Sequence, residues 1–262
     1  MIFSPGIFQG QTALVTGGGT GIGRATALLL ARLGAKVAIA SRKLENLEAT
    51  ARELAAVVGE ANVHHQTCDV REPAEVAALA TAVAEKLGGI DLLVNNAGGQ
   101  FPSPAEMITP KGWDAVIRNN LNGTFHVTVE VAKRCMIPAR RGRIVNVTAS
   151  VYRGFPGMSH TGAARAGVEN LTMTLAVEWA PYQIAVNAVA PGVIASSGIS
   201  RYPVEAVELA RRATPLKRAG TEDEVAQTIV FLLSPAAAFI TGAILPIDGG
   251  MRLWGDTWPI PG

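Results

Sequence analysis

The chain has 262 residues, of which 48% are apolar and 17% charged, and its formal net charge is +2. So large an apolar fraction excludes a disordered chain, and so small a charge without a basic face argues against a nucleic-acid-binding protein. Arg, Lys, Gly and Pro interrupt the apolar stretches before they reach the about 20 residues that cross a bilayer, so no membrane partner is expected. Two cysteines are too few for a disulfide framework and predict a cytoplasmic protein. No residues have metal-ligand spacing, so no metal is predicted.

Strand-like and helix-like segments alternate along the chain. Short apolar, β-branched runs predict strands at 12–15, 36–40, 63–68, 92–95, 143–147, 185–189 and 243–246. Apolar side chains at helical spacing predict helices at 22–33, 44–58, 73–87, 112–134, 161–179 and 222–233. This alternation indicates one α/β domain over residues 1–262, a Rossmann-type, doubly wound, seven-stranded parallel sheet with helices on both faces. The least regular segment, 194–215, is expected to form the substrate-binding loop region.

The first predicted strand runs into a glycine-rich turn that opens the first predicted helix. Glycines let the backbone turn tightly and approach a pyrophosphate, whose charge is favoured at a helix N-terminus. Placement between a strand and a helix distinguishes such a dinucleotide site from an ordinary turn. The residues predicted to bind the pyrophosphate are Gly17, Thr20, Gly21, Ile22 and Gly23.

The end of the second predicted strand indicates which nucleotide binds. It reads Ser41, Arg42, Lys43, without the carboxylate that would bind free ribose hydroxyls and repel a 2′-phosphate. Ser41 can hydrogen-bond such a phosphate, and Arg42 can bind it through two parallel hydrogen bonds. The sequence therefore predicts NADP as the cofactor.

Two further strand ends are expected to complete the cofactor site. Asp69 and Val70 follow the third strand, where they can meet the adenine edge through a side chain and a backbone group. Asn96, Ala97 and Gly98 follow the fourth strand, where small residues let a ribose lie against the backbone.

The chain resembles the short-chain dehydrogenase/reductase family over nearly its whole length. The resemblance rests on residues 16–23, 95–98, 120–123, 191–192 and 247–250. It implies that Asn120 is a catalytic asparagine and that Pro191, Gly192 and Ile194 flank the nicotinamide. It also implies a homotetramer assembled through the helices predicted at 112–134 and 161–179.

The family's Tyr-x-x-x-Lys pair is missing from its expected place. Thr161 stands in the tyrosine position and Arg165 in the lysine position, while Thr148 falls where the family has a serine. A threonine hydroxyl does not titrate usefully and a guanidinium does not release its proton, so this site is poorly suited to protonate an alkoxide. Arg165 is expected to hold the nicotinamide ribose as a fixed cation.

Hydride addition to an unsaturated thioester makes a smaller demand, because the charge is delocalised in an enolate that hydrogen-bond donors can stabilise. Longer strings, such as 95–106 and 160–168, are similar to the peroxisomal trans-2-enoyl-CoA reductase and 2,4-dienoyl-CoA reductase branch of the family. The prediction is an oxidoreductase that uses NADPH to reduce the C=C bond of a 2-enoyl-CoA or 2,4-dienoyl-CoA, with an acyl-CoA thioester as its partner.

Several side chains are candidates for the chemistry of this reaction. Asn120 and Tyr152 are predicted to donate to the enolate oxygen, with Thr148 and Thr161 as auxiliary donors. His160 is the alternative proton donor, because an unperturbed imidazole titrates near neutral pH. Gln100 and Phe101 are expected to line the acyl channel.

Two other functions stay open. One is a carbonyl or alcohol short-chain dehydrogenase/reductase acting on a substrate without CoA, with His160 or Tyr152 as the acid. The other is a catalytically silent NADPH-binding protein, since the tyrosine and lysine are both missing.

Overall fold

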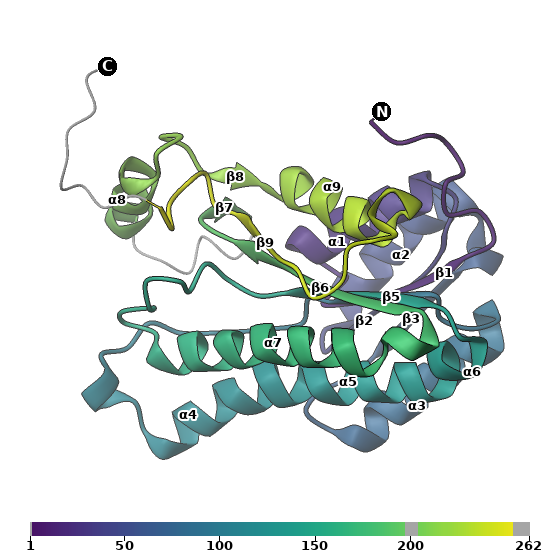
Figure 1. The fold of residues 1–262 in the computed structure, drawn as a ribbon, viewed down its shortest axis with the longest axis horizontal. Helices are drawn as coiled ribbons and strands as arrows, with labels where there is room; N and C mark the ends of the chain where they lie inside the picture. The colour runs from purple at the N-terminus through teal and green to yellow at the C-terminus, as the bar shows by residue number, and fades with distance from the viewer. Residues whose placement is uncertain (1, 197–203, 254–262) are drawn as a thin grey trace.

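The computed structural model describes residues 2–196 and 204–253. Within them, seven strands form one parallel sheet in the order β3-β2-β1-β4-β5-β6-β9 (Figure 1). The strands are β1 (Thr12–Thr16), β2 (Lys36–Ser41), β3 (Val63–Thr67), β4 (Leu92–Asn95), β5 (Gly142–Val147), β6 (Ile184–Pro191) and β9 (Ile244–Ile247). The order reverses between β1 and β4, and a reversal of this kind opens a ligand crevice at the carboxyl ends of the strands. The predicted doubly wound sheet is confirmed.

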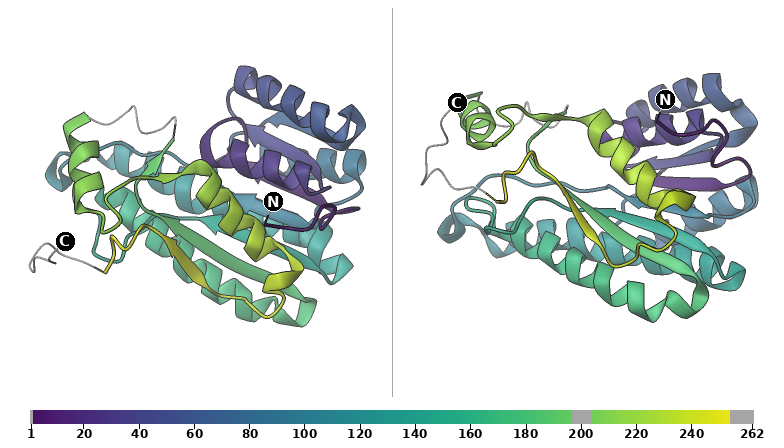
Figure 2. Two further views of the ribbon diagram at one scale, coloured as in Figure 1. Left: turned by 90° about the horizontal axis from the view of Figure 1, so that it is seen from above. Right: turned by 45° about the horizontal axis from the view of Figure 1, so that its top comes forward.

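Helices cover both faces of the sheet (Figures 1 and 2). One face carries α1 (Gly21–Arg32), α2 (Leu44–Val58) and α9 (Glu222–Leu233), and the other carries α3 (Pro73–Leu87), α5 (Gly123–Val131) and α7 (Ser159–Glu178). Successive side chains of a strand point to opposite faces, so Ala13 and Val15 enter one core while Leu14 enters the other. Burial on both faces explains why the strands read as continuous apolar runs.

The helix predicted at 112–134 is part of a longer helical run. It comprises α4 (Pro110–Ile117), the π-helical turn η3 (Arg118–Asn122), α5, a second π-helical turn η4 (Ala132–Met136) and α6 (Ile137–Ala139). Thr109 caps the start, because its Oγ1 accepts a hydrogen bond of 3.1 Å from the Gly112 N–H. Insertions of this kind are frequent at functional sites, and η3 carries Asn120.

The segment expected to be irregular, 194–215, contains regular structure. β7 (Ile194–Ala195) pairs with β8 (Gly220–Thr221) apart from the main sheet, and α8 is a helix over Val204–Ala213. The sequence pattern missed α8 because its apolar positions are exposed and its polar face is charged, with Glu208 paired to both Arg211 and Arg212. Residues 197–203 lie outside the described residues, so the role of this segment in substrate binding stays a prediction.

Short 3-10 turns and a polar network complete the fold. The turns are η1 (Glu60–Asn62), η2 (Ala105–Met107), η5 (Ala180–Tyr182) and η7 (Pro235–Ala237). Asn95 of β4 donates to Thr128 at 2.7 Å and to Asn146 of β5 at 2.8 Å, and Asn146 donates to Thr172 of α7 at 2.9 Å. These buried hydrogen bonds fix α7 against the carboxyl halves of β4 and β5. Nowhere in the described chain is a helix both long and apolar enough to span a bilayer.

Candidate active site

The glycine-rich turn leaves room only for backbone. Gly17 has a φ of +66°, and a Cβ atom there would lie 2.7 Å from the Asn96 Nδ2 atom. A Cβ atom on Gly23 would overlap the Gly17 carbonyl oxygen. Thr20 is the N-cap residue of α1 but its side chain makes no capping hydrogen bond within the described structure, and the first turn holds no acidic residue. Such a helix N-terminus fits a pyrophosphate.

Asn96 joins the glycine-rich turn to the end of β4. Its Nδ2 donates to the carbonyl oxygens of Thr16 at 3.1 Å and Gly17 at 3.2 Å. Its backbone N–H and that of Ala97 both donate to the Thr16 hydroxyl at 3.1 Å. Asn96 therefore positions the two loops that border the crevice, and Ala97 and Gly98 present the backbone to it.

The exposed cations at the ends of β2 and β3 lie around Asp69. Arg71 forms an ion pair with Asp69, with an Nε–Oδ1 distance of 2.8 Å. This hydrogen-bonded guanidinium, together with the nearby charge of Arg42, lowers the pKa of Asp69 from 3.8 to about 2. Arg42 is exposed, and the Ser41 hydroxyl accepts a hydrogen bond of 3.4 Å from the Lys43 N–H. Arg71 was not predicted, although it stands only two residues after Asp69.

Val70 lies beneath this cationic cluster. Its side chain is buried, and its carbonyl oxygen lies 3.3 Å from Nδ1 of His126. The Val70 backbone is therefore held against α5, next to the predicted adenine position.

Arg165 is buried where the family has its lysine. Its Nη1 donates to the Val147 carbonyl oxygen at 2.9 Å, and Nε has no hydrogen-bond partner among the described residues. A Cβ atom on Gly98 would overlap the Arg165 Nη2 atom, so the guanidinium lies directly against the Gly98 backbone. Burial lowers the pKa of Arg165 from 12.5 to about 10, which leaves it a cation at neutral pH. A buried, incompletely paired cation beside Gly98 fits a ribose of a nicotinamide dinucleotide.

Asn120 is fully buried and its amide hydrogens are both in use. Nδ2 donates to the Gly99 carbonyl oxygen at 2.7 Å and to the Val116 carbonyl oxygen at 2.9 Å. Oδ1 accepts from the Gly99 N–H at 3.2 Å. In this arrangement both amide hydrogens are bound within the protein and Asn120 holds Gly99 in place, while its role as a donor to an enolate stays a prediction.

Thr148 is likewise paired inside the protein. Its Oγ1 lies 3.1 Å from the Val189 carbonyl oxygen and 3.2 Å from Oε1 of Glu169, and the single hydroxyl hydrogen serves these two acceptors. Thr148 is therefore not free to act as the expected auxiliary donor. Burial raises the pKa of Glu169. This carboxyl was not predicted, although it stands eight residues after Thr161 and four after Arg165, on the same side of the helix.

Thr161 and His160 form a buried pair in the first turn of α7. The Thr161 N–H donates to Nδ1 of His160 at 2.8 Å, and the Thr161 hydroxyl lies 3.2 Å from the same nitrogen. Nε2 of His160 has no partner within the described chain. The ring of Phe101 packs edge-to-face on the imidazole, with centroids 4.5 Å apart. The Thr161 hydroxyl is thus bound to His160 rather than displayed alone, and α7 begins two residues before the predicted start.

Tyr152 belongs to a different group of side chains, which includes Arg252. Its ring is 45% exposed, and the Arg252 guanidinium carbon lies 5.2 Å from the ring centroid. Partial burial and the charge of Glu169 raise the pKa of Tyr152 above its ordinary value of 10, so the phenol is a weak acid. The predicted proton donor is therefore poorly suited to transfer a proton, although it keeps a hydroxyl that can donate a hydrogen bond.

The residues expected to flank the nicotinamide connect the ends of β6 and β9. The Pro191 carbonyl oxygen accepts from the Ser150 N–H at 2.9 Å, and the Gly192 N–H donates to the Ile247 carbonyl oxygen at 3.0 Å. A Cβ atom on Gly192 would lie 2.9 Å from the Asp248 Cα atom, so only glycine fits this crossing. Ile194 is buried in β7.

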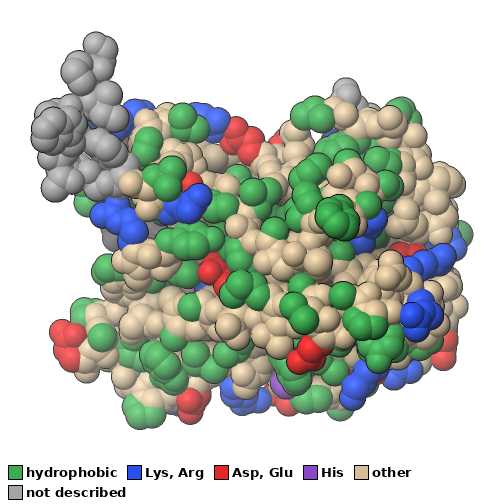
Figure 3. All heavy atoms as spheres, viewed as in Figure 1, with side chains coloured by type: hydrophobic (Ala, Val, Ile, Leu, Met, Phe, Trp, Pro, Cys, Tyr) green, Lys and Arg blue, Asp and Glu red, His purple; other side chains and the backbone are tan. Residues whose placement is uncertain are grey.

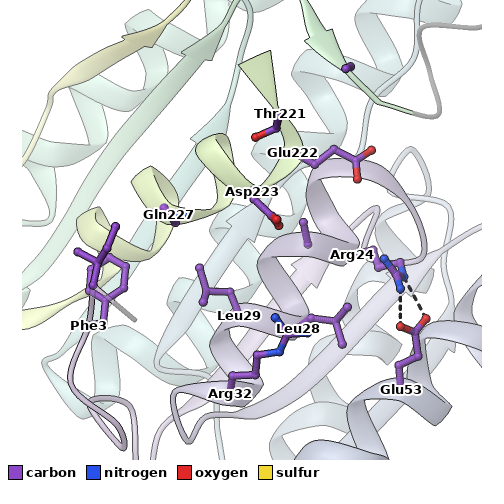
Figure 4. Close-up of a pocket in the computed structure, with 13 residues that line it drawn as sticks. Phe3, Arg24, Leu28, Leu29, Arg32, Glu53, Thr221, Glu222, Asp223 and Gln227 are labelled. Carbon is purple, nitrogen blue, oxygen red and sulfur yellow. Dashed lines mark hydrogen bonds and ion pairs between the residues drawn. The ribbon is translucent and has the colours of Figure 1, made fainter. Parts of the chain in front are cut away.

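A cavity of about 600 Å³ lies elsewhere, between α1, the N-terminal segment and the start of α9 (Figure 4). Arg24 and Glu53 form an ion pair at its edge, and Phe3 closes the other end. None of the predicted site residues lines it. The glycine-rich turn and Gly98 follow the carboxyl ends of β1 and β4, and Arg165 lies against Gly98, so these residues stay the predicted active site.

Known proteins share this architecture. A family model described as Enoyl-(Acyl carrier protein) reductase matches residues 17–252. The solved structure of the citronellol catabolism dehydrogenase of Pseudomonas aeruginosa PAO1 is 48% identical, covers 96% of this chain and 98% of its own, and has a TM-score of 0.86. The probable 2,4-dienoyl-CoA reductase of Bacillus subtilis is 37% identical over 95% of this chain and 98% of its own length. The 3-oxoacyl-(acyl-carrier-protein) reductase of Thermotoga maritima is 39% identical over 93% and 98%. The chain belongs to the short-chain dehydrogenase/reductase family, oxidoreductases that use a nicotinamide cofactor.

Proposed function

We propose that the protein reduces the C=C bond of a 2-enoyl-CoA or 2,4-dienoyl-CoA thioester with NADPH. The proposal rests on the two residues that stand where the family has its tyrosine and lysine. They are Thr161, which is hydrogen-bonded to His160, and the buried Arg165. Neither side chain can deliver a proton to an alkoxide at neutral pH, whereas N–H donors are sufficient to stabilise an enolate. The 2,4-dienoyl-CoA reductases among the relatives support the same substrate class.

The choice of NADPH is supported by the charges at the end of β2. Arg42 is exposed and its charge reaches Asp69, so it lies over the adenosine side of the crevice. Arg71 lies there too, but its charge is paired with that of Asp69. A cationic site without a carboxylate at the end of β2 favours a 2′-phosphate over free ribose hydroxyls.

The division of work among the residues follows from their contacts. NADPH, when bound, would supply a hydride to Cβ of a 2-enoyl-CoA. Arg165 holds the ribose near Gly98, and Asn120 fixes the Gly99 backbone beneath the reacting atoms. Charge then accumulates on the thioester oxygen, where donors rather than acids are needed, and Cα takes its proton from water.

The proposal is tested by following NADPH absorbance with two substrate panels. Crotonyl-CoA, trans-2-octenoyl-CoA and 2,4-decadienoyl-CoA form the first panel, and the CoA-free carbonyl compounds cyclohexanone and citronellal form the second. We expect turnover with at least one member of the first panel and at least 100-fold lower kcat/KM with the second. Folded, NADPH-binding protein that turns over none of the first panel would overturn the proposal.

A second candidate is reduction of a carbonyl group, or oxidation of an alcohol, on a substrate without CoA. It is favoured by the identity of 48% to a citronellol catabolism dehydrogenase and by the ketoreductases among the relatives. Turnover confined to the second panel would support it. Binding of NADPH without turnover of either panel would instead support a silent nucleotide-binding protein.

Self-association through α5 and α7 is also proposed. The side chains of Phe125, Met173 and Val177 are exposed on these helices. Figure 3 shows hydrophobic side chains over this face of the molecule. Burial of such a face between copies of the chain would be favourable, and a mass measurement in solution tests the predicted homotetramer. The cytoplasmic location stays a prediction.

A further inference from the structure

We infer that His160 is a catalytic hydrogen-bond donor, whose Nε2–H stabilises the negative charge on the thioester oxygen of the substrate. The inference rests on the proposed function, since it assigns a donor to the enolate of that reaction. His160 would supply the hydrogen-bond donor that Asn120 and Thr148 do not, because the hydrogens of those two side chains are already bound within the protein.

The position of His160 is the first argument. It is the second residue of α7, next to Thr161 in the position where the family has its catalytic tyrosine. It packs on Phe101, which follows the carboxyl end of β4. β4 and β5 are neighbours in the sheet, so the imidazole lies at the edge where this fold binds its ligands.

The hydrogen bond at Nδ1 is the second argument, because it fixes the tautomer of the ring. Nδ1 accepts the backbone N–H of Thr161 at 2.8 Å, so Nδ1 carries no hydrogen. The hydrogen of the neutral imidazole is therefore on Nε2. Nδ1 therefore accepts a backbone N–H in the first turn of α7, and Nε2 keeps a hydrogen that it can donate.

The third argument is that this donor has nothing to bind. His160 is fully buried, and its Nε2 has no hydrogen-bond partner in the described residues. A buried donor without a partner is unfavourable and rare in native proteins, and a catalytic role is one of the explanations for such a group. The partner it needs is an acceptor, and a thioester oxygen that gains negative charge is a strong one.

Phe101 provides the route for that acceptor. Its ring centroid lies 4.5 Å from that of the imidazole and the residue is 39% exposed, so Phe101 both contacts the buried His160 and reaches the surface. An acyl chain is as apolar as the ring it would displace. An acyl group that took the place of the Phe101 ring would lie directly against the imidazole.

The step is balanced without proton transfer from His160. Hydride adds to Cβ, the C=C electron pair moves toward the carbonyl, and the thioester oxygen gains the charge while Nε2–H donates a hydrogen bond to it. The enolate then collapses as Cα takes a proton from water. From a 2-enoyl-CoA, the products are the saturated acyl-CoA, the oxidised cofactor and the hydroxide left by that water, and His160 keeps its hydrogen throughout.

Two substitutions distinguish the donor role of Nε2 from the role of Nδ1 as acceptor of the Thr161 N–H. His160→Asn keeps an acceptor near the place of Nδ1 and removes the Nε2 donor, whereas His160→Gln can place an amide N–H near Nε2. With crotonyl-CoA and NADPH we expect His160→Asn to lower kcat about 100-fold, as loss of one oxyanion donor does, with KM and NADPH affinity within threefold of wild type. We expect His160→Gln to retain kcat within tenfold of wild type. If His160→Asn keeps wild-type kcat, the inference is overturned and the histidine is only a cap.

Nitrogen-15 NMR of the histidine rings decides the case in which both variants lose activity. Wild-type protein with NADP⁺ is titrated with butyryl-CoA, the product of crotonyl-CoA reduction, and the signal of His160 is identified by its absence in His160→Asn. A hydrogen on Nε2 that shifts on binding supports the inference, whereas a hydrogen on Nδ1, or no shift, overturns it. Wild-type protein that reduces no enoyl-CoA would refute the proposed function instead, which the first assay shows before any variant is made.

Discussion

Arg165→Met separates two effects of the buried guanidinium. One is its effect on the free energy of unfolding, and the other is its expected contact with the cofactor. The methionine fills most of the same volume without charge. The substitution removes the 2.9 Å hydrogen bond to the Val147 carbonyl oxygen and the cation next to Gly98.

The pKa of Arg165 sets the size of the first effect. Its fall from 12.5 to about 10 means that burial disfavours the charged form by about 3 kcal/mol. The folded-state pKa lies below the unfolded one, so this cost is fully present at any pH below about 10 and is relieved only as the pH rises toward 12.5. Loss of a hydrogen bond from a charged donor costs about 1.5–3 kcal/mol in the opposite direction. We therefore expect the unfolding free energy of the cofactor-free variant to stay within about 1.5 kcal/mol of wild type.

The second effect falls on NADPH. A lost charged contact of about 1.5–3 kcal/mol corresponds to a Kd that is about 10- to 100-fold weaker. At a concentration 100-fold above the wild-type Kd, NADPH stabilises the protein by about 2.7 kcal/mol, and a 30-fold weaker Kd reduces this to about 0.9 kcal/mol. Urea unfolding with and without NADPH measures both quantities on one sample.

Arg143→Met is the matched control for this experiment. Arg143 is a half-buried guanidinium on β5, and burial lowers its pKa as it lowers that of Arg165, but it lies at the amino end of the strand. Its replacement should leave the NADPH Kd unchanged. A Kd for Arg165→Met within twofold of wild type would refute the contact, and a loss of more than about 3 kcal/mol in the cofactor-free protein would refute the stability reasoning.

Three further substitutions test other parts of the site. Arg42→Ala should weaken NADPH binding about 10- to 100-fold and leave NADH binding unchanged, whereas Arg52→Ala on the exposed face of α2 should change neither, as titration calorimetry would show. Gly98→Ala should abolish nucleotide binding because its methyl group overlaps the buried guanidinium, whereas Gly99→Ala meets only a flexible amide at 3.3 Å and should bind normally; equal affinities would contradict this reading. Burial raises the pKa of Glu169, so this carboxyl stabilises the fold at pH below its unfolded-state value and loses that contribution as the pH rises through its folded value. Glu169→Gln should therefore gain stability relative to wild type between pH 4 and 8, and parallel stability curves would argue against the effect.

The fold could be predicted because burial on both faces of the sheet marks each strand. β1 is buried at all of its positions, and no exposed face interrupts its apolar run. The glycine-rich turn could be predicted for a related reason, since Gly17 and Gly23 have no space for a Cβ atom. Both signals are local, and each is visible in a few consecutive residues.

The pairing within the site could not be predicted in the same way. The π-helical turn that carries Asn120 changes the backbone hydrogen bonds of the helix without changing the apolar spacing. One of the two amide hydrogens of Asn120 and the hydroxyl of Thr148 bind partners that lie 21 to 41 residues away in sequence. Which hydrogens remain free depends on those distant contacts, so a resemblance can identify a residue and still miss what its side chain does.

The distribution of unpaired donors indicates the chemistry of the site. Among the described residues, the buried side-chain N–H groups without a partner belong to Arg143, His160 and Arg165. Arg143 is the second residue of β5, at the amino edge of the sheet, whereas the other two lie five residues apart in α7. The hydrogens of Asn120 and Thr148, two of the predicted enolate donors, are already bound within the protein. A site whose unpaired groups are N–H donors binds anionic charge and stabilises it, and an enolate meets that condition.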